Sequence, residues 1–529
     1  MNLQRNEYVL GIDLGLTNTC AAIMTSRTPD PIVISYSDSS HFLKSCVKYG
    51  KPFDVGSAAY KHLTYGLPGV VKNSRRIIGR YYKDEVVQKC VKDHLCGAEI
   101  KEVNKKPVFV IDNTTLVSPS DVSSEIIKRV VEKADEFVKR AYGDEMKCTK
   151  IAVTFPAYFD NYQRTATLLA VEKAGISKER LTMINEPTAA AFYFCKSNKI
   201  DNQTILVYDL GDESFDVSIV RVKGDDYRVL KYAGNSFLGN ADIDSLFAKE
   251  IEKKYEEEND VPLIDTNDER IRRRYYCRLN AIAEDAKKQL SNFETVEIDL
   301  SMFRIHNKND SDSESESDSD SEEEIMLDVF HHTIEIVQKC ITDCNMNVSD
   351  IDRVVMIGGS SRLTIIRDRL RQLFGYEKLS KAVNPDEAVA CGACLSLVEK
   401  LNLNFPSICR LSEELMGSQI EFLIRSRTHI EYKCEQVKPY LDYCSILQNC
   451  KSCAIYHGDI SYCYANGKQG QFSMIGKYKS EENRSSRSSV FSFVTIYTID
   501  EWGIIHIIEK CKDNNQILVD SCIRWEEPI

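Results

Sequence analysis

The most constraining feature of the sequence is a strand–turn–strand pattern that occurs twice, about two hundred residues apart. Residues 9–24 read as a buried strand, a tight Asp-Leu-Gly turn at residues 13–15, and a returning strand. Residues 205–220 repeat the pattern around a second Asp-Leu-Gly at residues 209–211. A repeat at this spacing predicts two similar halves rather than a solenoid, whose period is tens of residues.

The chain between the two hairpins alternates helix and strand. Apolar residues keep helical spacing from Ile126 to Ala141, and Ser120 is a candidate N-cap for that helix. Residues 151–155 form a short apolar run that Pro156 stops, which is typical of a buried strand. Strands that alternate with helices of this length predict an α/β domain whose sheets are covered by helices.

The α/β pattern fades near Leu403, and the rest of the chain reads as β structure. Residues 492–499 and 503–508 alternate in polarity as strands do. We expect an α/β domain, a linker and a small mainly β domain, at residues 1–403, 404–415 and 416–529.

One acidic run carries most of the net charge. The fifteen residues 310–324 are all Ser, Asp or Glu and hold nine of the twelve net negative charges, which leaves about −3 for the rest. A nearly balanced remainder has no basic stripe for a phosphate backbone, so no nucleic-acid partner is expected. We expect the insertion, residues 309–325, to be a solvated loop, with a helix resuming at Glu322. Its serines are also candidate acceptors for an acid-directed kinase.

Targeting and metal signals are weak. No run of eighteen or more apolar residues occurs and the start lacks a signal pattern, so we expect a soluble cytoplasmic protein without a membrane partner. The nineteen cysteines are scattered, which fits thiols in a reducing compartment. Cys450 and Cys453 form a lone Cys-x-x-Cys, and buried or loop thiols are favoured there over a zinc site because a matched second pair is missing.

The paired Asp-x-Gly turns are the candidate chemical site. Gly15 and Gly211 would let backbone N–H groups approach phosphate oxygens, while Asp13 and Asp209 could hold Mg²⁺ and its waters from opposite sides. A glycine turn at residues 358–359 could admit a purine. Ordinary strand-end carboxylates are the alternative interpretation, but the matched contexts favour a nucleotide cleft.

Five segments resemble the seventy-kilodalton heat-shock chaperone family. In chain order they are residues 11–15, 156–159, 184–191, 358–362 and 384–390, and they extend over about the first 400 residues. The resemblance implies an α/β actin-like ATPase fold of two duplicated lobes, followed by a degenerate β substrate-binding domain. The family's helical lid has no counterpart in the sequence.

The resemblance also implies roles for individual residues. Asp13 and Asp209 would set a hydrated Mg²⁺ beside ATP or ADP, and Glu186 would help position the attacking water. Arg75 stands where the family has a catalytic lysine. The other catalytic or cofactor-binding candidates carried over from the family are Gly15, Thr17, Gly211, Ser214, Glu284, Lys287, Lys288, Ser291, Gly358, Gly359, Ser360, Arg362 and Asp386.

The phosphate loops depart from the family pattern. Leu16 replaces a hydroxyl-bearing threonine, and Asp212 and Glu213 replace two glycines. Each new carboxylate within about 6 Å of a phosphate charge would cost roughly 2 to 3 kcal/mol at an effective dielectric of ~20. Arg75 keeps the charge of the family's lysine but brings a bulkier planar fork. We therefore expect nucleotide binding to survive more readily than efficient hydrolysis.

Two functions from different classes follow. The first is a monomeric ATP-dependent chaperone that hydrolyses ATP slowly, binds unfolded or extended polypeptides, and works with J-domain co-chaperones and nucleotide-exchange factors. The second is a nucleotide-binding pseudo-ATPase that serves as a regulatory or scaffold protein. A small-molecule kinase of the same superfold is disfavoured because the motifs at residues 184–191 and 384–390 resemble those of the chaperones.

Overall fold

The computed structural model describes most of the first 400 residues and the strands that follow. It leaves out residues 1–2, 37–39, 66, 113, 212–213, 236–237, 265, 291–294, 301–302, 304–314, 363, 381–382, 400–401, 405–420, 423–431, 434–451, 459–471, 480–492, 500–504, 512–516 and 523–529. The chain divides into two compact units: one holds residues 1–158, 170–402 and 527–529, and the other residues 159–169 and 403–526.

The first sheet of the larger unit is built on the first Asp-Leu-Gly hairpin. Strand β1 (Glu7–Asp13) pairs antiparallel with β2 (Asn18–Thr25), with Asp13 opposite Cys20, and parallel with β11 (Lys147–Phe155). The sheet order is β12-β11-β1-β2-β3, and β4 also pairs with β2. The remaining strands are β3 (Ile32–Val33), β4 (Phe42–Lys44) and β12 (Leu181–Asn185).

The second sheet repeats this arrangement around the second hairpin. Strand β13 (Thr204–Leu210) pairs antiparallel with β14 (Phe215–Lys223), with Asp209 opposite Asp216, and parallel with β18 (Arg353–Ile357). Strand β15 (Asp226–Asn235) extends the sheet beside β14. In both sheets the Asp-Leu-Gly strand therefore has an antiparallel hairpin partner on one side and a parallel strand on the other.

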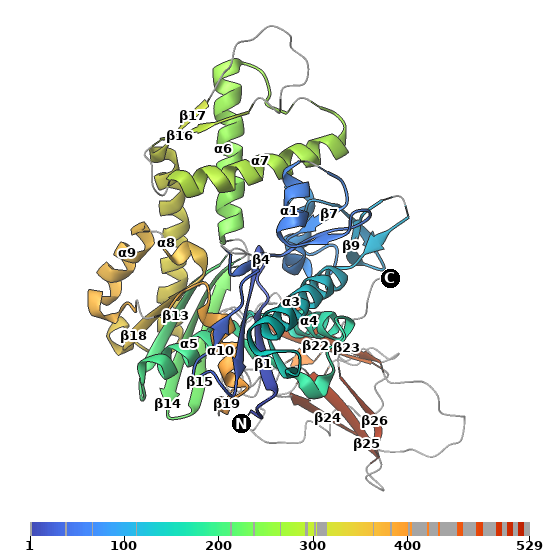
Figure 1. Ribbon diagram of the computed structural model, residues 1–529, viewed down its shortest axis with the longest axis vertical. Helices are drawn as coiled ribbons and strands as arrows, with labels where there is room; N and C mark the ends of the chain where they lie inside the picture. Colours follow the sequence, from blue (N-terminus) through green and yellow to red (C-terminus); the bar gives the residue numbers. More distant parts are fainter. Residues whose placement is uncertain are drawn as a thin grey trace. The chain divides into compact units, whose positions relative to one another are not determined.

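Two short helices, α5 (Glu186–Asn198) and α10 (Ala388–Ser396), pack on each other beside the two sheets (Figure 1). Helix α10 contacts the first sheet, where the Cys394 thiol donates to the Val9 carbonyl at 3.7 Å. Helix α5 contacts strands of both sheets. A Cβ atom on Gly392 would lie only 1.9 Å from the Ala189 carbonyl oxygen. The two helix backbones can approach this closely because Gly392 has no side chain.

Helix α3 (Pro119–Tyr142) confirms the helical periodicity but begins at a different cap. Ser118, not Ser120, is the N-cap: its hydroxyl accepts from the Asp121 N–H at 3.1 Å, and the Asp121 carboxylate accepts from the Ser118 N–H at 2.9 Å. The prediction of Ser120 was wrong because Pro119 fits the first helical position, where its missing N–H costs nothing. The cap therefore lies one residue before the proline.

A separate hydrophobic core lies between helices α6 (Asn240–Asn259) and α7 (Glu269–Leu290), which cross in Figure 1. Phe247, Ile251, Leu279 and Ala283 are buried between them. The helix expected over residues 284–290 is therefore the end of a longer helix. Hydrophobic residues of strands β13 and β14 pack instead against α8 (Ser319–Asp343) and α9 (Thr364–Phe374).

The acidic segment differs from the expected loop where the structure describes it. Residues Ser315–Asp318 form strand β17, which pairs antiparallel with β16 (Thr295–Ile298), and helix α8 begins at Ser319 rather than Glu322. The earlier start has a physical reason, since acidic residues in the first turns of a helix interact favourably with its macrodipole. Residues 310–314 lie outside the described part.

The other elements of the larger unit complete the surroundings of the two sheets. They are β5 (Cys46–Lys48), β6 (Asp54–Val55), α1 (Ser57–Thr64), β7 (Val70–Lys72), η1 (Ser74–Ile77), α2 (Glu85–Lys92), β8 (Glu99–Val103), β9 (Lys106–Val110), β10 (Leu116–Val117), η2 (Lys178–Arg180), η4 (Val348–Asp350), η5 (Gly359–Arg362) and η6 (Tyr376–Lys378). Helix α4 (Asn161–Lys173) and strand β19 (Asn402–Asn404) each contain residues assigned to both units.

The described part of the second unit is mainly strands. The predicted strand at residues 492–499 corresponds to β24, and that at 503–508 to β25; the two pair antiparallel. The strands are β20 (Glu421–Phe422), β21 (Tyr432–Lys433), β22 (Ser452–Gly458), β23 (Phe472–Lys479), β24 (Phe493–Ile499), β25 (Ile505–Cys511) and β26 (Ile517–Cys522). Among the helices that the structure describes, none combines the length and apolar character needed to cross a bilayer.

Candidate functional site

The turns of the two hairpins line one cavity of about 200 Å³ in the larger unit. The hairpins contribute Asp13 and Gly15 from one side and Asp209 and Gly211 from the other. The segments that follow β18 and precede α10 supply much of the remaining wall. The described lining residues are Asp13, Gly15, Leu16, Asn18, Cys20, Phe42, Arg75, Glu186, Asp209, Gly211, Ser214, Asp216, Gly358, Gly359, Pro385, Asp386 and Val389.

Gly358 fixes the wall that follows strand β18. Its φ of 80° lies in the left-handed region, and a Cβ atom there would lie 2.3 Å from the Leu210 carbonyl oxygen. The Gly358 N–H donates to the Pro385 carbonyl at 3.2 Å. Only glycine satisfies both the backbone angle and the close approach. The predicted glycine turn thus joins β13, β18 and the segment before α10 at one wall of the cavity.

Acidic side chains from four elements face this cavity. Asp13 ends β1, Asp209 lies near the end of β13, Asp216 lies on β14, and Glu186 begins α5. Burial raises the pKa of Asp209 well above its usual range, and the negative charges of Glu186, Asp216 and Asp13 raise it further, while Arg75 opposes them. Ionisation of Asp209 is therefore costly in this cavity, and a bound cation would reduce that cost.

The sequence predicts that Asp13 and Asp209 hold Mg²⁺ through its waters. Within the described residues, no group of three or more His, Cys, Asp or Glu side chains is arranged to hold a metal ion. Mg²⁺ usually keeps several of its waters and takes only one or two carboxylates from a protein. The role of Asp13 and Asp209 in holding Mg²⁺ through water stays a prediction.

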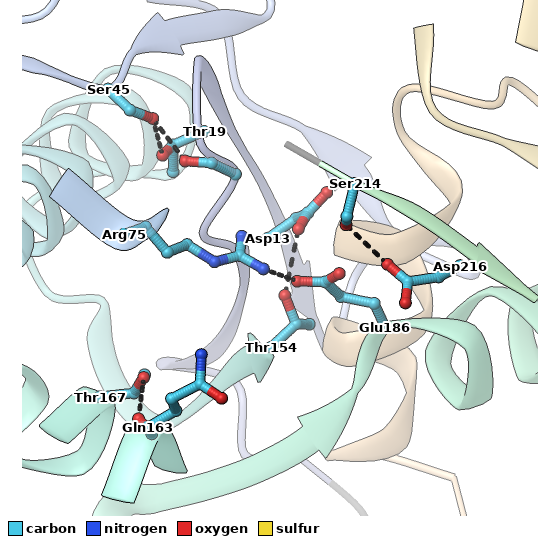
Figure 2. A network of polar contacts seen from close by, with 11 residues as sticks. Asp13, Thr19, Ser45, Arg75, Thr154, Gln163, Thr167, Glu186, Ser214 and Asp216 are labelled. Carbon is cyan, nitrogen blue, oxygen red and sulfur yellow. Dashed lines mark hydrogen bonds and ion pairs between the residues drawn. The ribbon is translucent and has the colours of Figure 1, made fainter. Parts of the chain in front are cut away.

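Arg75 supplies a positive charge on the wall, and it is already engaged. Its guanidinium Nη2 donates to Glu186 Oε1 at 2.5 Å, and both side chains are about nine-tenths buried (Figure 2). Arg75 lies on the 3-10 turn η1, directly after strand β7. The two predicted catalytic residues are thus brought together, although 111 positions separate them in the sequence.

Hydroxyl groups orient several of the acidic and glycine residues. The Ser214 hydroxyl donates to Asp216 Oδ2 at 2.8 Å, and the Thr154 hydroxyl donates to Asp13 Oδ1 at 3.1 Å (Figure 2). The Ser45 hydroxyl donates to the Gly15 carbonyl at 2.7 Å. Sequence reasoning did not find Thr154 or Ser45. Thr154 had a usable signal, because it is the polar residue in the apolar run of residues 151–155.

Thr17 and Glu284 line a smaller cavity of about 30 Å³ instead. Glu284 accepts from Lys44 Nζ at 3.2 Å and from the Tyr60 hydroxyl at 2.6 Å, so its carboxylate is already paired. The Lys44 ammonium also lies 4.9 Å from the centroid of the Tyr60 ring. A nucleoside contact by Glu284 would compete with these two partners. Sequence reasoning missed both of them.

Three predicted positions, Asp212, Glu213 and Ser291, lie outside the described residues. At Lys287 and Lys288 on α7, and at Ser360 and Arg362 on η5, only the backbone belongs to the described part. Cys450 also lies outside the described part. Leu16, by contrast, is buried and lines the main cavity, so an apolar group faces the site where the resemblance implied a hydroxyl.

Comparison with known families identifies the group of proteins to which this arrangement belongs. The family model described as Hsp70 protein matches residues 9–520, from strand β1 to strand β26. The chain belongs to the Hsp70 family. Hsp70 proteins have an actin-like ATPase fold, and the mixed α/β structure of the larger unit agrees with it. They generally bind ATP or ADP with Mg²⁺, as well as unfolded polypeptides and co-chaperones.

The acidic cavity of this Hsp70 chain combines glycine turns with buried carboxylates. Glycine turns offer backbone amides to phosphates, and buried carboxylates favour a cation with its waters. The family match also separates the chain from the small-molecule kinases that were the third interpretation of its sequence.

Proposed function

We propose that this Hsp70 chain is a chaperone whose main cavity binds Mg·ATP or Mg·ADP. The observation that carries the proposal is the convergence of Asp13 and Asp209, from the two hairpins, on one cavity closed by the Gly358 turn. The turns at Gly15 and Gly211 would receive the phosphates, and the two aspartates would hold the waters of the cation. When bound, Mg²⁺ neutralises phosphate charge.

The same residues support slow hydrolysis. Thr154 orients Asp13 through its hydroxyl, and Glu186 is the candidate group for accepting a proton from water. Arg75 donates to Glu186 Oε1, so this oxygen becomes available to water only when the pair opens, which would slow hydrolysis.

Nucleotide state would regulate polypeptide binding by the β-strand unit. The clients would be unfolded or extended chains, which can add main-chain hydrogen bonds to strands. J-domain proteins and nucleotide-exchange factors are the partners that membership of the family suggests, and we expect the chain itself to be a monomer.

A pseudo-ATPase is the second candidate, and two observations favour it. Leu16 places an apolar side chain in the cavity, and the guanidinium of Arg75 is held by Glu186. A single-turnover assay with radiolabelled ATP separates the two functions. An ATP-dependent chaperone requires measurable hydrolysis, whereas a pseudo-ATPase that serves as a scaffold would bind ATP without turnover. The double variant Asp212→Gly/Glu213→Gly tests whether those acidic residues suppress the reaction.

Thermal unfolding with and without Mg·ATP tests nucleotide binding itself. A ligand that binds only the folded chain stabilises it by about 2.7 kcal/mol at a concentration of 100 Kd. We expect the melting temperature to rise with Mg·ATP or Mg·ADP and to rise less after EDTA is added. If neither nucleotide changes the melting temperature, the proposal is wrong.

A further inference from the structure

The charge balance of the main cavity is one-sided. Its described lining includes five acidic side chains, from Asp13, Glu186, Asp209, Asp216 and Asp386, and a single basic one, from Arg75. An anionic ligand that enters this cavity is therefore repelled by most of the wall and attracted mainly by one guanidinium. The availability of that guanidinium should therefore determine how strongly the cavity binds ligands of higher negative charge.

That guanidinium is not freely available, because Glu186 uses it. Nη2 donates to Glu186 Oε1 in a charge-assisted hydrogen bond, a class stronger than bonds between neutral groups. Both side chains are largely shielded from water, so their attraction is screened less than that of a surface pair. Glu186 and an incoming phosphate are both anionic acceptors, so they compete for the same group.

The neighbouring arginine holds the turn that carries Arg75. The Arg76 side chain is 1% exposed and donates from Nη1 and Nη2 to the two carboxylate oxygens of Asp242, at 2.8 and 3.2 Å. Asp242 in turn accepts from the Gly239 N–H at 3.1 Å, at the start of helix α6. A turn anchored in this way cannot easily follow a ligand. Arg75 must therefore change partner by rotating its own side chain.

We propose that Glu186 is an internal competitor for Arg75, which lowers affinity for a nucleoside triphosphate relative to the diphosphate. The terminal phosphate adds negative charge and needs the guanidinium most, whereas a diphosphate lacks that group. Exchange of Arg75 between Glu186 and the terminal phosphate thus sets the discrimination between the two nucleotides. This inference rests on the proposed nucleotide-binding function.

Calorimetric titration with Mg·ADP and with a non-hydrolysable Mg·ATP analogue tests the proposal. Glu186→Gln keeps the shape of the side chain but removes the charge that holds Arg75. We expect it to tighten binding of the triphosphate analogue by about tenfold, while the Kd of Mg·ADP changes by less than about twofold. The double variant Arg75→Ala/Glu186→Gln should lose this gain.

Asp216→Asn is the matched control, since it removes one negative charge from the same cavity at a carboxylate that accepts from the Ser214 hydroxyl. It should change both affinities by a similar factor. Circular dichroism checks folding, and Glu186→Ala replaces the glutamine variant if that variant does not fold.

Three results would overturn the inference. In the first, Glu186→Gln raises the affinities for both nucleotides by the same factor. In the second, the gain in triphosphate affinity persists in the Arg75→Ala/Glu186→Gln variant. Either result rules out the competition for Arg75 but is compatible with nucleotide binding. If neither nucleotide binds to any variant or to the wild type, the proposed function fails together with the inference.

Discussion

At the scale of single residues, ionisation of the Asp209 carboxyl is unfavourable in the folded chain. Burial, followed by the charges of Glu186, Asp216 and Asp13, raises its pKa in the folded chain. The folded chain therefore binds this proton more tightly than the unfolded chain does. Stability must fall as the pH rises from the unfolded value of about 3.9 towards the raised folded value, and then level off.

We expect Asp209→Asn to melt at a higher temperature than the wild type when no ligand is present, because the asparagine is never ionised. The difference should grow as the pH rises through that window, and calorimetric melting curves from about pH 4 to about pH 8 measure it. Mg·ATP should no longer raise the melting temperature of the variant. A stability difference that is independent of pH would contradict this account of Asp209.

Gly358 offers a second test at this scale. Gly358→Ala should lower the melting temperature because a Cβ meets the Leu210 carbonyl oxygen at 2.3 Å, and a positive φ costs a further 1–2 kcal/mol or so. Nucleotide-induced stabilisation should fall with it. Gly375→Ala is the control, since φ there is 94° and nothing lies within 4 Å of the added Cβ. Equal losses in both variants would show that backbone strain alone is responsible.

The sequence predicted which residues would meet at the site better than how they would bond. Matched Asp-Leu-Gly turns and the glycine turn were enough to bring Asp13, Asp209 and Gly358 together. The partners of Glu284 were out of reach, because Lys44 is 240 positions away and reaches Glu284 only through tertiary packing. Periodicity reports the burial of a side chain, and it does not report which distant charge that side chain meets.

At the scale of elements, local patterns predicted the body of α3 but not its first residue. Apolar spacing identifies the buried face of a helix, whereas the cap depends on how Ser118, Pro119 and Asp121 share the exposed N–H groups. The acidic run shows the same limit. Its composition indicated solvation and gave no sign that residues 315–318 would pair with β16.

The close packing of α5 on α10 predicts the sign of the stability change that Gly392→Ala causes. Gly392→Ala adds one methyl group at 1.9 Å from the Ala189 carbonyl oxygen, so the helices must move apart. We expect the free energy of unfolding to fall by roughly 1–3 kcal/mol, as in other overpacked cores. Denaturant titration measures it. In an uncrowded helix the same change would stabilise the chain by up to about 1 kcal/mol, so a gain would contradict the close contact.

At the scale of the whole molecule, membership of the Hsp70 family extends the argument beyond the cavity. The match covers residues 9–520 and therefore includes strands of the second unit. Sequence motifs were sufficient to predict the family, because they follow in order along the first 400 residues or so. The bonding of the site required the structure, because it depends on pairs such as Arg75 and Glu186.

The proposal that nucleotide state regulates polypeptide binding, which we call gating, predicts that the two ligands bind in a linked way. We expect the affinity for a fluorescent extended peptide to differ by at least about fivefold between the Mg·ADP and Mg·ATP states, because coupling free energies of 1–3 kcal/mol are typical. Fluorescence anisotropy measures the peptide affinity. By linkage, saturating peptide must change the nucleotide affinities by the same ratio. Equal peptide affinity in both states would rule out gating and favour the scaffold function.

The most direct test of the central claim is calorimetric titration of a non-hydrolysable Mg·ATP analogue into the wild type, Asp13→Asn and Asp209→Asn. The account predicts one nucleotide bound per wild-type chain in the presence of Mg²⁺, and binding at least about tenfold weaker in each variant. Absence of binding to the wild type, or the same affinity in all three proteins, would show that the two hairpins do not hold the nucleotide.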